Sequence, residues 1–128
     1  MGLALFTYAA YDIPAAIGPY SQGIGADSIV VTSGQLPIDP ATGAIVEGGI
    51  QAQTEQSLKN LEAILAEAGL TVDNVIKTTV YLADIQDFAA MNEIYAKHFT
   101  ASFPARSAFQ VAALPKGALV EIEALCAR

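Results

Sequence analysis

The sequence predicts an α+β fold, with one mixed sheet and two helices on one face of it. Two segments, near residues 48–68 and 84–98, carry apolar residues at helical spacing, whereas the segments around them are β-branched or alternate in polarity. A chain of 128 residues has the size of one domain, and no linker or internal repeat interrupts it. We therefore expect residues 1–128 to form a single domain.

The first part of the chain is expected to contain a β-hairpin. Residues 20–24 and 28–33 have strand character, and Gly25-Ala26-Asp27 between them suits a short turn. The preceding residues 13–19 contain two prolines and a glycine, which predicts an irregular loop. Residues 34–43 are also rich in turn-forming residues.

Two helices should follow. The first is expected after Gly48-Gly49 and ends near Ala68, where Gly69 suits a helix stop. Its polar face is predicted to include Gln53 among several glutamates and glutamines. The second should begin with Asp84 or Asp87 as its cap and run through His98. Its apolar stripe is Phe88, Met91, Ile94, Tyr95 and Phe99.

Three further strands are predicted at residues 75–83, 106–111 and 119–125. The expected order is roughly β-β-β-α-β-α-β-β, although only two of the first three strands can be assigned to residues. Two helices on one face leave the other face of the sheet uncovered. Since 53% of the residues are hydrophobic and only 15% are charged, we expect partner subunits to bury that face.

The charge balance excludes some partners. The net charge is −7, and the six basic residues are scattered singly, so no basic patch for nucleic acid or an anionic membrane is expected. No apolar run approaches membrane-span length, and the first residues lack the basic region of a signal peptide. We expect a soluble cytoplasmic protein.

The chain holds one cysteine and one histidine. An internal disulfide, a zinc site of cysteine pairs and a multi-histidine metal site are therefore impossible. Cys126 is interpreted as an inert core thiol. His98 lies near a helix end, where a charge partner is a commoner role than a catalytic base.

Arg106 is the candidate of most interest, because the only other arginine is the C-terminal Arg128. A guanidinium is a planar fork of donors that suits a carboxylate. Arg106 opens an apolar strand, so one interpretation is a clamp for a small organic acid. The alternative is an arginine paired with a surface glutamate or with a carbonyl at the sheet edge.

Glu121 and Glu123 lie two residues apart on the last predicted strand, so both face the same side. They are either solvated or, for one of them, partly buried as a general base for water. Burial would raise the pKa of such a carboxyl, and a nearby Arg106 would lower it. Ser33 and Gly34 offer a hydroxyl and a backbone N–H to an anion, or form a simple turn.

Several blocks together resemble the RidA (YjgF-type) family of reactive intermediate deaminases, over essentially the whole chain from residue 13. The blocks are Ala15–Gln22 (AAIGPYSQ), Thr32–Gly43 (TSGQLPIDPATG), Val75–Leu82 (VIKTTVYL), Pro104–Ser107 (PARS) and Leu114–Glu123 (LPKGALVEIE). The resemblance implies a chorismate-mutase-like fold, a homotrimer with clefts between subunits, and no cofactor or metal.

It also implies hydrolysis of 2-iminobutanoate and 2-iminopropanoate, in exchange with enamines such as 2-aminoacrylate, to 2-oxo acids and ammonia. By position, Arg106 matches the carboxylate-binding arginine and Glu121 the carboxylate that positions or activates water. The cleft-lining positions of the family match Tyr20, Ser33, Gly34 and Asn92. Many members carry Cys two residues after the arginine, where this chain has Ala108.

An alternative from another class remains open. A trimer of this kind would also serve as a metabolite-binding protein that holds a 2-oxo acid or related carboxylate without turnover. Arg106 is needed by both, whereas Glu121 is needed only by the enzyme. A ribonuclease role, proposed for some members, fits least because the chain is acidic.

Overall fold

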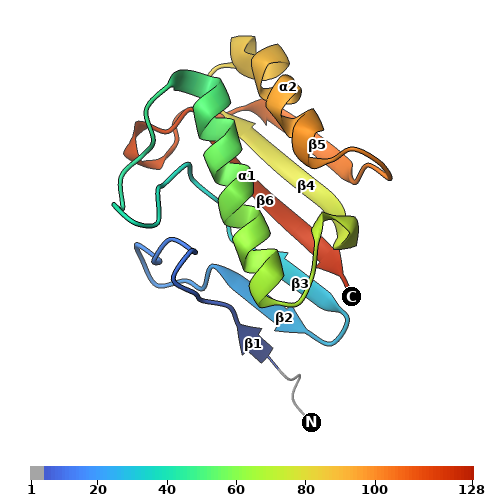
Figure 1. Cartoon of the computed structure of the whole chain (residues 1–128). Helices are drawn as coiled ribbons and strands as arrows, with labels where there is room; N and C mark the ends of the chain where they lie inside the picture. Colours follow the sequence, from blue (N-terminus) through green and yellow to red (C-terminus); the bar gives the residue numbers. More distant parts are fainter. Residues whose placement is uncertain (1–4) are drawn as a thin grey trace.

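The structure, a computed structural model that describes residues 5–128, is a six-stranded mixed sheet with two helices packed on one side (Figure 1). This is the predicted α+β architecture. The strands are β1 (Leu5–Thr7), β2 (Gly23–Ala26), β3 (Ile29–Thr32), β4 (Val75–Leu82), β5 (Ala105–Gln110) and β6 (Val120–Ala127). The helices are α1 (Gly49–Glu67) and α2 (Phe88–His98), with short 3₁₀ turns η1 (Val72–Asn74), η2 (Ile85–Asp87) and η3 (Pro115–Gly117).

The strand order is β1-β2-β3-β6-β4-β5. The pair β4–β5 is parallel, and α2 provides the crossover between its two strands; every other neighbouring pair is antiparallel. The last strand, β6, lies in the middle of the sheet between β3 and β4. β6 thereby joins the N-terminal strands β1–β3 to the strands β4 and β5 in one sheet.

Local sequence sets the end of α1 as predicted, whereas neither Asp84 nor Asp87 caps α2 itself. Gly69 has a φ of 75°, and its N–H donates to the carbonyl of Ala66 at 3.0 Å, which closes the last turn of α1. Ahead of α2, the Asp84 carboxylate accepts a hydrogen bond from the N–H of Gln86 at 2.9 Å, whereas the side chain of Asp87 caps nothing. Asp84 therefore caps η2, and α2 continues directly from that turn.

The first hairpin differs from the prediction. β2 begins at Gly23 and not at Tyr20, because the N–H of Tyr20 donates within the loop to Gly18 at 2.9 Å. The turn falls at Asp27-Ser28, where Asp27 has a φ of 51°. The strand that the sequence did not locate is β1, which pairs with β2.

The two faces of the sheet differ in what covers them. On β6, alternate residues from Val120 to Cys126 are fully or almost fully buried beneath the helices. Glu121, Glu123 and Leu125 point to the opposite face, as the alternation predicted. The main core lies between sheet and helices. Its fully buried members are Val30, Leu58, Leu61, Leu65, Val80, Leu82, Met91, Val120, Ile122 and Cys126.

The opposite face carries apolar side chains that neither helix covers. Ile29, Val31 and Phe109 remain 38%, 40% and 45% exposed there. Figure 1 shows both helices on the other side of the sheet. Within residues 5–128, no helix is both long enough and apolar enough to cross a membrane.

Candidate active site

Arg106 lies on β5 and faces α2. In the parallel register of β4 and β5 it is opposite Thr78, whose hydroxyl is 2.7 Å from that of Tyr95 on α2. The guanidinium Nη1 of Arg106 donates to the Asn92 Oδ1, also on α2, at 2.7 Å. Two candidates that are 14 residues apart in sequence are therefore in direct contact.

Two aromatic rings of α2 hold the same guanidinium. Its Cζ lies 4.7 Å from the ring centroid of Tyr95 and 5.4 Å from that of Phe88, within cation–π range. No carboxylate of residues 5–128 forms an ion pair with Arg106. The alternative of an arginine paired with a surface glutamate is therefore wrong for the described chain, and the positive charge is available to an anion.

A hollow of about 490 Å³ adjoins this guanidinium. Its lining residues come from α2, from the loop before β5 and from β5 itself; they are Asn92, Tyr95, Ala96, Phe103, Pro104 and Arg106. Phe103 is 71% exposed, which is unusual for a phenylalanine and leaves one wall of the hollow open. The hollow is wide enough for a small organic acid.

Glu121 lies on the other face of the sheet. It is half-buried and packs against Gly34, which follows β3. A Cβ atom added to Gly34 would lie 2.6 Å from the carboxyl Cδ of Glu121, so a larger residue here would displace the carboxyl from this position. Gly34 and Glu121 thus form the second direct contact among the candidates.

Burial raises the pKa of the Glu121 carboxyl, and the negative charge of Glu123 raises it further. The two glutamates share a face of β6, with Tyr81 of β4 opposite Glu121 in the register. The Tyr81 hydroxyl donates to the Glu123 Oε1 at 3.0 Å. Glu123 is therefore held in place, and Glu121 is left with no hydrogen-bond donor among the described side chains.

The remaining candidates, Ser33 and Tyr20, are connected to Gly34 through the chain and one hydrogen bond. The Ser33 hydroxyl donates to the carbonyl of Ser21 at 2.6 Å, which ties the residue before Gly34 to the loop that carries Tyr20. Tyr20 is 43% exposed, and its hydroxyl accepts a long hydrogen bond of 3.3 Å from the N–H of Ile17. The six candidates thus form two groups, Arg106 with Asn92 and Glu121 with Gly34, Ser33 and the Tyr20 loop.

Some residues of the arginine group were not predicted as functional. Phe88 and Tyr95 belong to the apolar stripe predicted for the second helix, and no functional role was predicted for either. Tyr95 is indeed buried, yet the face of its ring also contacts the Arg106 guanidinium. The aromatic residues in the stripe of α2, the helix just before the only internal arginine, were the sequence signal that could have indicated these contacts. Ala108 lies on the same side of β5 as Arg106 and packs against the core.

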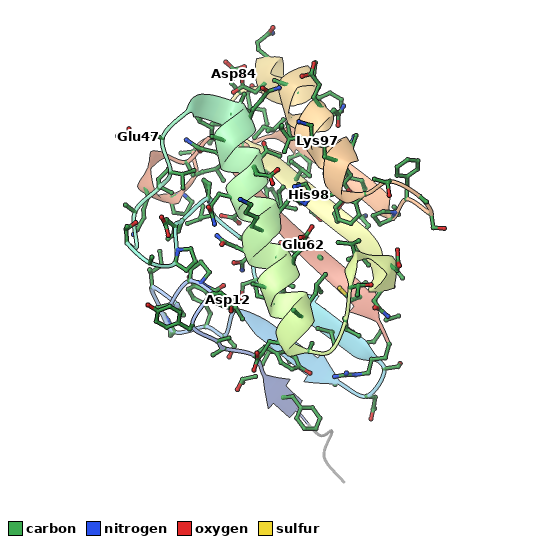
Figure 2. All side chains as sticks on the ribbon, in the orientation of Figure 1. Asp12, Glu47, Glu62, Asp84, Lys97 and His98 are labelled. Atoms are coloured by element: carbon green, nitrogen blue, oxygen red, sulfur yellow. The ribbon has the colours of Figure 1, made fainter. Side chains whose placement is uncertain are left out.

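His98 and Cys126 both contribute to the packing of the fold. The His98 ring nitrogens lie 2.7 Å from a Glu55 carboxylate oxygen and 2.6 Å from one of Glu62, so His98 is a charge partner that joins α2 to α1 (Figure 2). Cys126 is fully buried, and burial raises the pKa of its thiol to about 11. Within residues 5–128, no three His, Cys, Asp or Glu side chains gather as metal ligands.

Comparison with known proteins shows the family to which the chain belongs. The sequence profile of the family described as "Endoribonuclease L-PSP" matches residues 11–128. The chain belongs to this family, the RidA (YjgF) family. The RidA relative from Salmonella typhimurium, named 2-iminobutanoate/2-iminopropanoate deaminase, is 51% identical over 125 residues, 95% of this chain and 97% of that protein. The human protein of the same name is 54% identical over 112 residues, 88% and 82% of the two chains.

Solved RidA-family structures have the same fold. Escherichia coli TdcF with bound serine matches with a TM-score of 0.92 and 45% identity, over 96% of this chain and 98% of that one. The Rid-family protein YyfA from Yersinia pestis matches with a TM-score of 0.94 and 48% identity, over 98% and 100% of the two chains.

Proposed function

We propose that this RidA-family chain hydrolyses 2-iminobutanoate and 2-iminopropanoate, the latter in exchange with 2-aminoacrylate, to 2-oxo acids and ammonia. The relatives named as deaminases for these two substrates are 51–55% identical over most of the chain. The structural observation that carries the proposal is a guanidinium, Arg106, that is oriented by neutral partners and borders a hollow with no carboxylate paired to it.

In this proposal Arg106 binds the substrate carboxylate. Asn92 and the rings of Phe88 and Tyr95 keep the guanidinium in one orientation without neutralising it. A planar carboxylate then accepts two parallel hydrogen bonds. Clamping the carboxylate fixes the imine carbon, which lowers the entropic part of the barrier. The bound serine of TdcF, a ligand of similar size with a carboxylate, supports a site of this class.

Glu121 acts on water in the second step. A carboxylate with a raised pKa is a better base than an ordinary glutamate while it stays ionised at neutral pH. It takes one proton as a water oxygen bonds to the carbon of the protonated imine, and the C=N bond becomes a C–N single bond, which gives a neutral carbinolamine. Glu121 returns that proton to the nitrogen, the C–N bond breaks and ammonia leaves; the hydroxyl proton passes to Glu121 as the carbonyl of the 2-oxo acid forms, and from there to ammonia, which departs as ammonium. Imine and water are consumed one for one.

The site is completed, in this proposal, between subunits of a homotrimer. Arg106 and Glu121 are on opposite faces of one sheet, so one chain alone presents two half-sites. The apolar residues Ile29, Val31 and Phe109 on the open face supply surface for subunit contact. A neighbouring subunit would then bring its Glu121 group to the Arg106 group of the first.

The direct test uses imine made in situ. A pyridoxal-phosphate dehydratase converts threonine to 2-iminobutanoate, and semicarbazide traps whatever imine survives. Wild type should strongly suppress the trapped product. Arg106→Ala and Glu121→Ala should each fail to suppress it. For Arg106→Ala the expected loss of transition-state stabilisation is about 2–4 kcal/mol, because the substrate anion loses its charged partner.

The same variants separate the two candidate functions. If wild type does not change the trapped product but binds 2-oxobutanoate in a titration that Arg106→Ala abolishes, the binding-protein function holds and the deaminase proposal fails. A ribonuclease function has little support, because the six basic residues are scattered and the net charge is −7.

A further inference from the structure

We propose that Gln22 and Gln35 are positioning residues that fix Gly34 against Glu121 and so set the place of the reactive carboxylate. This inference rests on the proposed deaminase function. Both side chains are amides in the interior, with Gln22 8% and Gln35 2% exposed. Burial of an amide is costly unless it is hydrogen-bonded, so both amides need partners inside the fold.

The two amides form one directed chain of hydrogen bonds. The Gln35 Nε2 donates to the Gln22 Oε1 at 2.7 Å and to the carbonyl of Ser33 at 3.1 Å. The Gln22 Nε2 then donates to the carbonyl of Pro14 at 3.1 Å. Each amide thus uses its donor on a backbone carbonyl, and the pair joins the loop before β2 to the turn after β3.

The backbone of Gln35 extends the connection to β6. Its N–H donates to the carbonyl of Ile122 at 2.7 Å, and the N–H of Ile122 donates back to Gln35 at 3.1 Å. Gln35 is the residue after Gly34, and Ile122 is the residue after Glu121. The bridge between Gln35 and Ile122 is therefore directly beside the contact between Gly34 and Glu121.

The close approach makes this position sensitive. Because Gly34 is within contact of the Glu121 carboxyl, a shift of the turn by a fraction of an ångström changes how much water reaches the carboxylate. The Gln22 carbonyl also accepts from the N–H of Ser33 at 2.8 Å, so the same two residues hold both ends of the turn. Arg106 and Asn92 lie on the other face and touch neither amide.

Methionine at either position keeps the length of the side chain and removes its hydrogen bonds. Gln35→Met and Gln22→Met should each lower kcat roughly 10- to 100-fold, the scale expected when a reacting group is displaced by about an ångström. The KM should change by less than about threefold, because the carboxylate clamp is intact. The double variant should lose about as much as either single variant, since both act through one chain.

A second readout does not depend on turnover. Carbon-13 NMR of the Glu121 carboxyl, assigned by comparison with Glu121→Gln, measures its pKa in each variant. The pKa should fall toward that of an ordinary glutamate in Gln35→Met, because a looser turn admits water to the carboxylate. Gln22→Met removes the Gln22 amide and leaves the Gln35 amide bonded to the Ser33 carbonyl, so the same fall in the pKa is expected from it should Gln35→Met not fold.

Asn74→Ala is the matched control. The Asn74 amide is also bonded to backbone, at the carbonyl of Ala127, but at the far end of β6 from Glu121. It should lower stability and leave both kcat and the pKa of Glu121 unchanged. A wild type without activity, together with the expected fall in the pKa, would defeat the deaminase function and leave the positioning role standing.

The inference is overturned if Gln35→Met and Gln22→Met keep wild-type kcat and the pKa of Glu121. It is also overturned if their losses in kcat are additive, or if Asn74→Ala produces the same loss as they do. Any of these results would make the two glutamines ordinary contributors to stability.

Discussion

Arg106 and Glu121 lie on opposite faces of the same sheet. Arg106 is in register with Thr78 of β4, which faces α2, and Glu121 is in register with Tyr81, three residues further along β4. Since neighbouring residues of a strand alternate between faces, an odd separation places the two side chains on different sides. A single chain therefore keeps the proposed carboxylate clamp and the proposed base on separate sides of the sheet.

Replacing Arg106 by lysine should impair catalysis although the charge is kept. An ammonium cannot form two parallel hydrogen bonds with a carboxylate, and it stacks less well on Tyr95 and Phe88. The expected loss is roughly 1.5–3 kcal/mol, or about 10- to 150-fold in kcat/KM. The measurement is the rate of suppression of trapped imine over a range of dehydratase fluxes.

Arg128→Lys is the matched control for this change. The Arg128 guanidinium donates to the carbonyls of Asp27 and Ala68 and to the Tyr8 hydroxyl, so it ties the end of the chain to the segment after β1. The variant should lower the unfolding temperature and leave kcat/KM at the wild-type value. Equal losses in kcat/KM from the two lysine variants would contradict a specific role for Arg106.

Glu123→Gln should lower the pKa of Glu121. Burial raises the pKa of Glu121, and the charge of Glu123 raises it further, so removing that charge reverses the second effect. The acid limb of the kcat/KM profile should move to lower pH, because the base ionises earlier. Glutamine keeps an oxygen that accepts from the Tyr81 hydroxyl, so the local packing is retained.

Tyr81→Phe separates charge from geometry in this cluster. It removes the hydrogen bond to Glu123 and leaves both carboxylates charged. The acid limb should therefore not move to lower pH as it does in Glu123→Gln. A shift of the same size in both variants would show that the packing of Tyr81, and not the charge of Glu123, controls Glu121.

Much of the fold followed from local patterns. The alternation on β6 predicted that Glu121 and Glu123 share a face, and Gly69 predicted the end of α1. These features depend on residues that are close in sequence. The start of β2 was missed because Tyr20 has strand propensity, but its N–H is bonded within the loop to Gly18.

The arrangement of the site could not be predicted in the same way. Which face Arg106 points to depends on the register of β5 against β4, which no local pattern specifies. Gln53 was assigned to the polar face of α1, yet it is 8% exposed and its Oε1 accepts from the N–H of Leu119 at 2.8 Å. A buried amide with a distant backbone partner has the same sequence signature as a solvated one.

His98 should make stability depend on pH. Burial opposes the charged form of the imidazole, but hydrogen bonds to Glu55 and Glu62 outweigh it, and the pKa is raised above 6.5. A pKa raised by folding contributes stability that is complete below the unfolded value and is lost as pH rises through the folded value. The unfolding free energy of wild type should therefore fall between about pH 6 and about pH 9 by roughly 1 kcal/mol, a small figure because the glutamates are partly exposed.

His98→Gln is the comparison for that measurement. Urea unfolding at one fixed protein concentration should give a less stable variant at about pH 6 and nearly equal proteins at about pH 9. A difference that stays constant between these two pH values would show that His98 acts through packing and not through its charge.

Cys126 should resist alkylation in the native protein. The thiol is fully buried and its pKa is raised to about 11, so the reactive thiolate is scarce and inaccessible. Intact-mass measurement after treatment with iodoacetamide should find no adduct on the native protein and one adduct after unfolding in urea. An adduct on the native protein would mean that β6 opens at its end.

The most direct test of the account mixes two inactive variants. Arg106→Ala and Glu121→Ala are unfolded together in equal amounts and refolded, so that the subunits of the two assort at random. If each site takes Arg106 from one subunit and Glu121 from its neighbour, about a quarter of the sites in a cyclic assembly carry both residues, and about a quarter of wild-type activity should return. Full loss in the mixture, with wild type refolded alongside to full activity, would contradict a site shared between subunits.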